Sequence, residues 1–142
     1  MKGFILFCFM IAALWDGVTT VLETAVILQA EEPIQYGFCV ASAVVILGFG
    51  FGTRTFFSKS GTVYTCFRLG WCLAIIFDVY TSFMGNARYV VLKQSFNVTT
   101  TEGFWRTVSQ MTMQQFLVVA VMTLLVSGSP VGYSYLVGED IK

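Results

Sequence analysis

Long apolar stretches separated by short polar segments dominate the hydropathy pattern of this chain. A transmembrane helix needs about 20 mostly apolar residues, at about 1.5 Å rise each, to cross about 30 Å of hydrocarbon. Four stretches reach or approach that length, and they run from about Phe4 to Leu28, Tyr36 to Gly52, Leu69 to Leu92 and Met111 to Val126. The pattern predicts an all-α integral membrane protein with four transmembrane helices in one domain, residues 1–142.

Polar residues and turn formers mark the predicted helix ends. Glu31-Glu32-Pro33 follows the first stretch, Arg54 bounds the second, and Ser127-Gly128-Ser129-Pro130 follows the fourth. Helices commonly end just before a proline, which cannot donate a backbone hydrogen bond. We therefore expect the fourth helix to end near Val126.

A signal peptide is an alternative for the first stretch. Lys2 would supply its positive segment and Gly3–Leu14 its apolar segment. The apolar run does not stop at a cleavage site, however, and continues past Asp16 to Leu28. We favour a retained transmembrane helix.

The distribution of lysine and arginine predicts the orientation. In multi-pass proteins, short loops rich in Lys and Arg stay in the cytoplasm. One side of the predicted membrane collects Lys2, Arg54, Lys59, Arg68 and Lys142, while the other collects Arg88, Lys93 and Arg106. We therefore expect a plasma or inner membrane protein with both termini in the cytoplasm.

The most informative feature is a similarity between the first and third stretches. Trp15–Thr20 (WDGVTT) recurs without gaps 62 positions later as Phe77–Ser82 (FDVYTS), and Thr24-Ala25 then matches Asn86-Ala87. The second and fourth stretches align poorly. We interpret the chain as two helical hairpins in parallel repeat, about residues 3–53 and 65–128.

Each repeat places one aspartate deep in the membrane. Asp78 is midway between Arg68 and Arg88, and Asp16 lies near the middle of its own stretch. An aspartate at that depth costs about 2.5–3.5 kcal/mol on insertion scales, so it usually faces a partner, a cavity or a pathway. If the two carboxyl groups meet, lost hydration and mutual repulsion oppose two charges, and we expect the pair to keep a proton.

Further polar residues lie on the same helix faces as these aspartates. On the first helix they are spaced i, i+3, i+4 and i+7, which places them on one side. The predicted polar cluster is Asp16, Thr19, Thr20, Glu23, Asp78, Thr81, Ser82 and Asn86.

Small residues suggest a packing surface on the second helix. Gly37, Ala41, Gly48 and Gly52 fall near one face, and the last two form a GxxxG motif. In lipid, small residues let helix backbones approach closely, which drives helix association. We expect this face to contact another helix.

Composition argues against enzymes and nucleic-acid binding proteins. Only 11% of the residues are charged, against about 25% in soluble domains, and the net charge is zero. The sequence has no histidine, no P-loop and no CxxC among its four cysteines, Cys8, Cys39, Cys66 and Cys72. We expect no enzymatic activity, cofactor or metal.

Two functions remain after these exclusions. The first is a structural or accessory subunit of a membrane assembly, a homo-oligomer or a larger complex, in which the aspartates fix helix register. The alternative is a cation or proton pathway lined by Asp16 and Asp78. Both imply the lipid bilayer as partner, together with further copies of the chain or other membrane subunits.

Overall fold

The computed structural model describes residues 1–97 and 102–138, which are helical apart from short connections. Its elements are α1 (Lys2–Ile27), α2 (Pro33–Ser58), α3 (Thr62–Gly85), the π-helix η1 (Asn86–Val91), α4 (Phe104–Ser109) and α5 (Met113–Gly138). Four helices in this part are long and apolar enough to cross a membrane: α1, α2, α3 continued by η1, and α5. The predicted number of membrane-length helices is confirmed.

Two of these helices extend beyond the apolar stretches that predicted them. α2 runs past Arg54 to Ser58, and α3 begins at Thr62 rather than near Leu69. At its start, α2 has Pro33 in the first turn and a capping box between Glu32 and Gln35. Helical hydrogen bonding does not require apolar side chains. A hydropathy pattern therefore marks the apolar part of a helix and not its ends.

The predicted end of the fourth helix near Val126 is wrong. α5 continues through Pro130 to Gly138. Pro130 cannot donate to the carbonyl of Val126, but the Ser129 hydroxyl donates to that carbonyl at 2.7 Å. The serine supplies the bond that the proline removes, as Ser and Thr side chains do in membrane helices.

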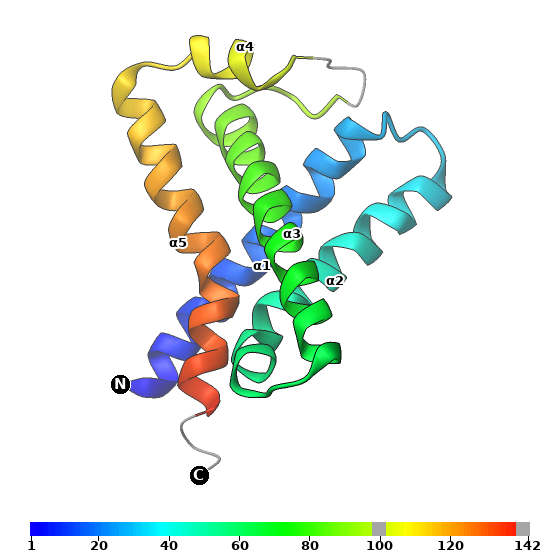
Figure 1. Cartoon of the computed structure of the whole chain (residues 1–142). Coiled ribbons are helices and arrows are strands. Elements are labelled where there is room, and N and C mark those ends of the chain that lie inside the picture. The colour runs from blue at the N-terminus through cyan, green and yellow to red at the C-terminus, as the bar shows by residue number, and fades with distance from the viewer. Residues whose placement is uncertain (98–101, 139–142) are drawn as a thin grey trace.

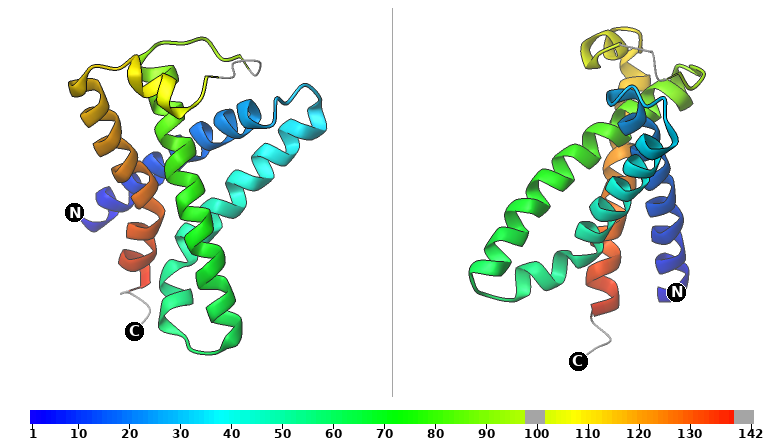
Figure 2. Two further views of the ribbon diagram at one scale, coloured as in Figure 1. Left: turned by 45° about the horizontal axis from the view of Figure 1, so that its top comes forward. Right: turned by 90° about the vertical axis from the view of Figure 1, so that its right-hand side faces the viewer.

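Each of the four membrane-length helices contacts the other three. At one end of the bundle α4 lies over η1, and we call this the α4 end (Figure 1). The opposite end holds the start of α1, the α2–α3 turn and the end of α5 (Figure 1). α2 bends toward its C-terminal end, and the α2–α3 turn lies apart from the start of α1 in both views of Figure 2.

The interior holds many polar residues beside two small apolar clusters, while large apolar residues cover the outside. Among the buried residues are Asp16, Asp78 and Thr81, whereas Phe4, Leu73 and many other large hydrophobic side chains are exposed. In water this arrangement would expose an extensive apolar surface that promotes aggregation. It suits hydrocarbon, where apolar side chains face lipid and polar side chains pair inside.

Close contacts between helices occur at small residues. A Cβ atom added to Gly50 of α2 would lie 2.7 Å from Pro130 Cβ of α5. One added to Gly85 of α3 would lie 2.8 Å from Thr19 Cβ of α1. These glycines bring the backbones together at the bundle centre, where the polar side chains lie.

Candidate functional site

The polar faces of α1 and α3 meet at the centre of the bundle. Asp16 is 0% exposed and Asp78 is 3% exposed. The four hydroxyl-bearing side chains beside them are also buried: Thr19, Thr20, Thr81 and Ser82. We call these six residues the polar centre, and the structure brings all of them together.

The hydroxyl groups connect the two helices through two matching chains of hydrogen bonds. Ser82 Oγ donates to Asp16 Oδ1, and Thr20 Oγ1 donates to Asp78 Oδ1 at 3.3 Å. A hydroxyl has a single proton to donate. Ser82 and Thr20 each use theirs on a carboxyl group, and each also lies 3.1 Å from a threonine hydroxyl of the opposite helix, Thr19 and Thr81 respectively. Thr19 and Thr81 also donate to backbone carbonyls of their own helices, those of Asp16 and Asp78, at 2.9 and 3.0 Å.

The two carboxyl groups also contact each other. Asp16 and Asp78 lie within hydrogen-bonding range of one another, although both are acceptors when ionised. Asp16 Oδ2 is buried and receives no hydrogen bond from any N–H or O–H group within 1–97 and 102–138. Two acceptor-only groups have thus been placed together in the interior.

Helix α5 contributes a third side to the polar centre. Ser127 Oγ donates to Asp16 Oδ1 at 3.0 Å. One turn earlier, Thr123 Oγ1 accepts from Asn86 Nδ2 at 3.4 Å, and Asn86 Oδ1 accepts from Trp15 Nε1 at 2.9 Å. Sequence reasoning predicted Asn86 but missed Ser127 and Thr123, although their i, i+4 spacing within an apolar stretch was a usable signal.

A buried ion pair lies between the polar centre and the α4 end. Arg88 Nη1 is 2.6 Å from Glu23 Oε1, and both residues are at most 4% exposed. The other terminal nitrogen of Arg88 donates to the backbone carbonyl of Glu102, just before α4. Sequence analysis counted Arg88 as a loop charge, but η1 turns it inward to neutralise the predicted polar residue Glu23.

At its glycines, the predicted packing face of α2 meets no other helix of the described part. Gly37, Ala41 and Gly48 are exposed, and a Cβ added at Gly37 or Gly48 would meet nothing within 4 Å. A Cβ on Gly52 would meet the ring of Phe56, in the same helix. Contact of this face with a helix of another chain stays a prediction.

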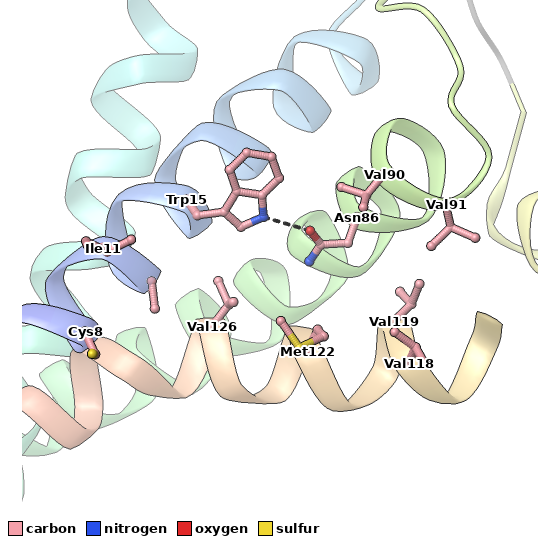
Figure 3. Close-up of a pocket in the computed structure, with 11 residues that line it drawn as sticks. Cys8, Ile11, Trp15, Asn86, Val90, Val91, Val118, Val119, Met122 and Val126 are labelled. Atoms are coloured by element: carbon pink, nitrogen blue, oxygen red, sulfur yellow. Dashed lines mark hydrogen bonds between the residues drawn. The ribbon is translucent and has the colours of Figure 1, made fainter. Parts of the chain in front are cut away.

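An apolar cavity of about 510 Å³ lies beside the polar centre. Its walls come from α1, η1 and α5, and the Trp15–Asn86 hydrogen bond crosses one side of it (Figure 3). Apart from the Cys8 thiol, its lining residues carry no titratable group. The cavity can hold an apolar chain and offers no acid–base pair.

The chemistry available in the buried interior of the described part is therefore that of two carboxyl groups, their hydroxyl donors and one buried ion pair. Such a set can fix helices together, hold a proton or pass one on. Comparisons with protein-family models, with curated proteins and with solved structures found no match to this chain.

Proposed function

We propose that this chain is a small, non-enzymatic, multi-pass membrane protein that acts as a structural or accessory subunit of a membrane assembly. The observation that carries the proposal is the closed polar centre. Its hydroxyl groups bond across helices, and Asp16 is 0% exposed. Interhelical hydrogen bonds of this kind are worth about 0.6–2 kcal/mol each in membranes, enough together to fix helix register.

The exposed face of α2 supports an assembly role. Gly37, Ala41 and Gly48 form an exposed strip on α2 that includes Val44 as its larger member, with Phe38 and Val45 beside it. A second helix can approach such a strip closely. We propose that this face contacts another copy of the chain or a different membrane subunit.

A cation or proton pathway is the second candidate. It is favoured by the carboxyl pair, because Asp16 and Asp78 face each other while the buried Arg88 already pairs with Glu23. The polar stripe of α1 also continues from Asp16 through Thr19 and Thr20 to Glu23, toward the α4 end. These groups could relay a proton if that end opened.

We further propose that the chain consists of two helical hairpins in parallel repeat. The hydrogen bonds between α1 and α3 support this, because an offset of 62 residues exchanges their members. The bond from Ser82 to Asp16 becomes the bond from Thr20 to Asp78, and the contact between Thr19 and Ser82 becomes that between Thr81 and Thr20. Reciprocal contacts are the signature of a two-fold axis.

The second helices of the hairpins, α2 and α5, correspond at an offset of 80 residues. This offset matches Gly48 with Gly128 and Gly52 with Gly132 without a gap. It also pairs buried positions with buried positions: Cys39 with Val119, Ala43 with Thr123, Ile46 with Val126, and Gly50 with Pro130. The two sequences aligned poorly by residue type, but they agree in which side chains face the interior.

Contacts between α2 and α5 follow the same offset. Gly50 packs against Pro130, its own counterpart, and the backbone N–H of Arg54 donates to Ser134, its own counterpart, at 3.1 Å. A residue meets its counterpart only on the symmetry axis. These contacts support a pseudo-two-fold axis that runs through both the α2–α5 crossing and the polar centre.

The last part of the proposal concerns the membrane in which the chain lies and its orientation there. Four membrane-length helices are consistent with a membrane protein, and we propose a plasma or inner membrane with both termini in the cytoplasm. The even number of spanning helices agrees with the start of α1 and the end of α5 lying at one end of the bundle (Figure 1).

Native mass spectrometry of the chain extracted in mild detergent tests the assembly role. We expect a defined complex larger than one chain, and we expect Gly48→Leu to dissociate it because the leucine fills the strip. Val45→Leu adds bulk to an exposed position about 60° around the helix from Gly48, at about 100° per residue, and is the matched control. A wild-type chain that is monomeric and alone under all mild extraction conditions would contradict the proposal.

Reconstituted vesicles separate the two candidate functions. The double variant Asp16→Asn, Asp78→Asn keeps size and hydrogen bonding but cannot titrate. Under the subunit proposal it assembles normally and wild-type vesicles show no proton or cation flux, whereas Asp16→Leu with Asp78→Leu disturbs assembly. Flux in wild-type vesicles that the Asn variant abolishes would instead establish the pathway.

A further inference from the structure

We propose that Asp16 and Asp78 form one proton-binding site on the pseudo-two-fold axis, and that Ser127 makes its halves unequal so that the proton resides on Asp78. The inference rests on the repeat proposed above and on the contacts of the polar centre. It does not depend on whether the chain assembles or conducts.

The first step is the contact between the carboxyl groups. Asp16 Oδ2 is buried without a donor, and the nearest carboxyl group is that of Asp78. Two carboxylates accept hydrogen bonds and donate none, so they can remain in contact in a dry interior only with a proton between them. One shared proton also removes one of the two negative charges.

The second step concerns the charges around the pair. On α1 the next charged side chain is Glu23, and η1 contributes Arg88, but these two neutralise each other at 2.6 Å. α5 carries no charged residue within 113–138, and on α2 the only one is Arg54, near its C-terminal end. α3 itself adds Arg68, which donates to the backbone carbonyls of Phe56 and Lys59 near the α2–α3 turn. Within the described residues, neither aspartate forms a salt bridge with a lysine or an arginine.

The third step is the symmetry of the donors. The pseudo-two-fold axis gives each aspartate one hydroxyl from the opposite helix, Ser82 for Asp16 and Thr20 for Asp78. With these donors alone the two carboxyl groups would be equivalent, and neither would be preferred as the proton carrier.

Ser127 breaks this equivalence. Its hydroxyl donates to Asp16 Oδ1 at 3.0 Å, while its counterpart at the offset of 80 is the apolar Leu47. Asp16 thus accepts two hydroxyl donors, which favour its ionised form. A hydroxyl has one proton, so Ser127, in donating to Asp16, has none left for Asp78.

Infrared spectroscopy of the purified full-length chain tests the site directly. The carbonyl stretch of a protonated carboxyl group is separate from the amide bands, and isotope labelling of aspartate distinguishes it from glutamate. Asp140 is replaced by Asn in every sample, so that Asp16 and Asp78 supply the whole signal. We expect the band in the parent chain, its loss in Asp78→Asn, and its persistence in Asp16→Asn.

Removing the asymmetry is the control for the role of Ser127. In a Ser127→Ala background each aspartate keeps one hydroxyl donor, and we expect the band to persist in both Asp16→Asn and Asp78→Asn. Circular dichroism of each variant verifies that the helices are retained.

Three results would overturn the proposal. Absence of the band in the parent chain would mean that no proton is held between the carboxyl groups. Persistence of the band in Asp78→Asn would place the proton on Asp16, and this single variant is enough for that conclusion. An unchanged pattern in the Ser127→Ala background would show that Ser127 does not choose the proton carrier.

Discussion

Gly85 of α3 lies against Thr19 of α1 so closely that a Cβ atom on the glycine would come within 2.8 Å of the threonine Cβ and 3.4 Å of its Cα. The approach leaves Thr19 Oγ1 only 3.1 Å from Ser82 Oγ. A missing side chain on α3 is therefore what allows the hydroxyl groups of the polar centre to bond across the helix pair.

Gly85→Ala should destabilise the bundle by separating α1 from α3. Forcing extra volume into a packed interior typically costs about 1–3 kcal/mol. Gly48→Ala is the matched control, because its added Cβ meets nothing within 4 Å and it gains the same helix propensity. Unfolding in mixed detergent micelles should give a difference of about 1–3 kcal/mol between the variants, and equal stability would refute the close crossing.

The ion pair between Glu23 and Arg88 should depend on both partners. Arg88→Met leaves a buried carboxylate and Glu23→Gln leaves a buried guanidinium, and breaking a buried pair typically costs about 3–5 kcal/mol. Replacing both, as Glu23→Leu with Arg88→Met, removes both charges and should destabilise less than the worse single variant. A double-mutant cycle measures this, and strictly additive losses would mean that the residues do not pair.

The Ser129 hydroxyl should contribute to the free energy of unfolding only while residue 130 is proline. Ser129→Ala leaves the carbonyl of Val126 without its 2.7 Å donor, and an unpaired buried backbone group costs about 1–3 kcal/mol. In a Pro130→Ala background the backbone N–H of residue 130 can donate to that carbonyl, so the same change should have little effect. Similar losses of unfolding free energy in both backgrounds would exclude this role.

The lysine and arginine bias predicts which loops face the cytoplasm. Ser60 lies in the α2–α3 turn and Ser95 follows η1, at opposite ends of α3 and η1. After replacement of the four native cysteines, an impermeant thiol reagent should label Ser95→Cys in intact cells and Ser60→Cys only after permeabilisation. The reverse pattern would invert the orientation and leave the helix arrangement unchanged.

Residues of the site differ in how well the sequence could predict them. Asp16, Thr19 and Thr20 form a stripe on one helix, and because the helical repeat alone decides such stripes, the sequence sufficed. Ser127 and Arg88 join the site through contacts with other helices. No local pattern states which helix lies opposite, so the donor to Asp16 and the partner of Glu23 became apparent only in the fold.

The correspondence proposed between α2 and α5 also could not be found from local sequence and depends on burial in the fold. Their residue types differ at most positions, since lipid accepts any apolar side chain, and a comparison of residue types therefore finds little. Burial depends instead on which face meets the bundle, and Cys39 and Val119 occupy equivalent buried positions despite their different chemistry.

By itself, the sequence determined the number of membrane-length helices and the polar faces of α1 and α3, because hydropathy and the helical period act locally along the chain. Tertiary structure decided where α5 ends, which glycines contact a neighbouring helix, and which cation pairs with Glu23. Each of these depends on atoms from segments far apart in the chain: the closest glycine contacts between helices of the described part are made at Gly50 and Gly85, while Gly48, part of the sequence motif, faces outward.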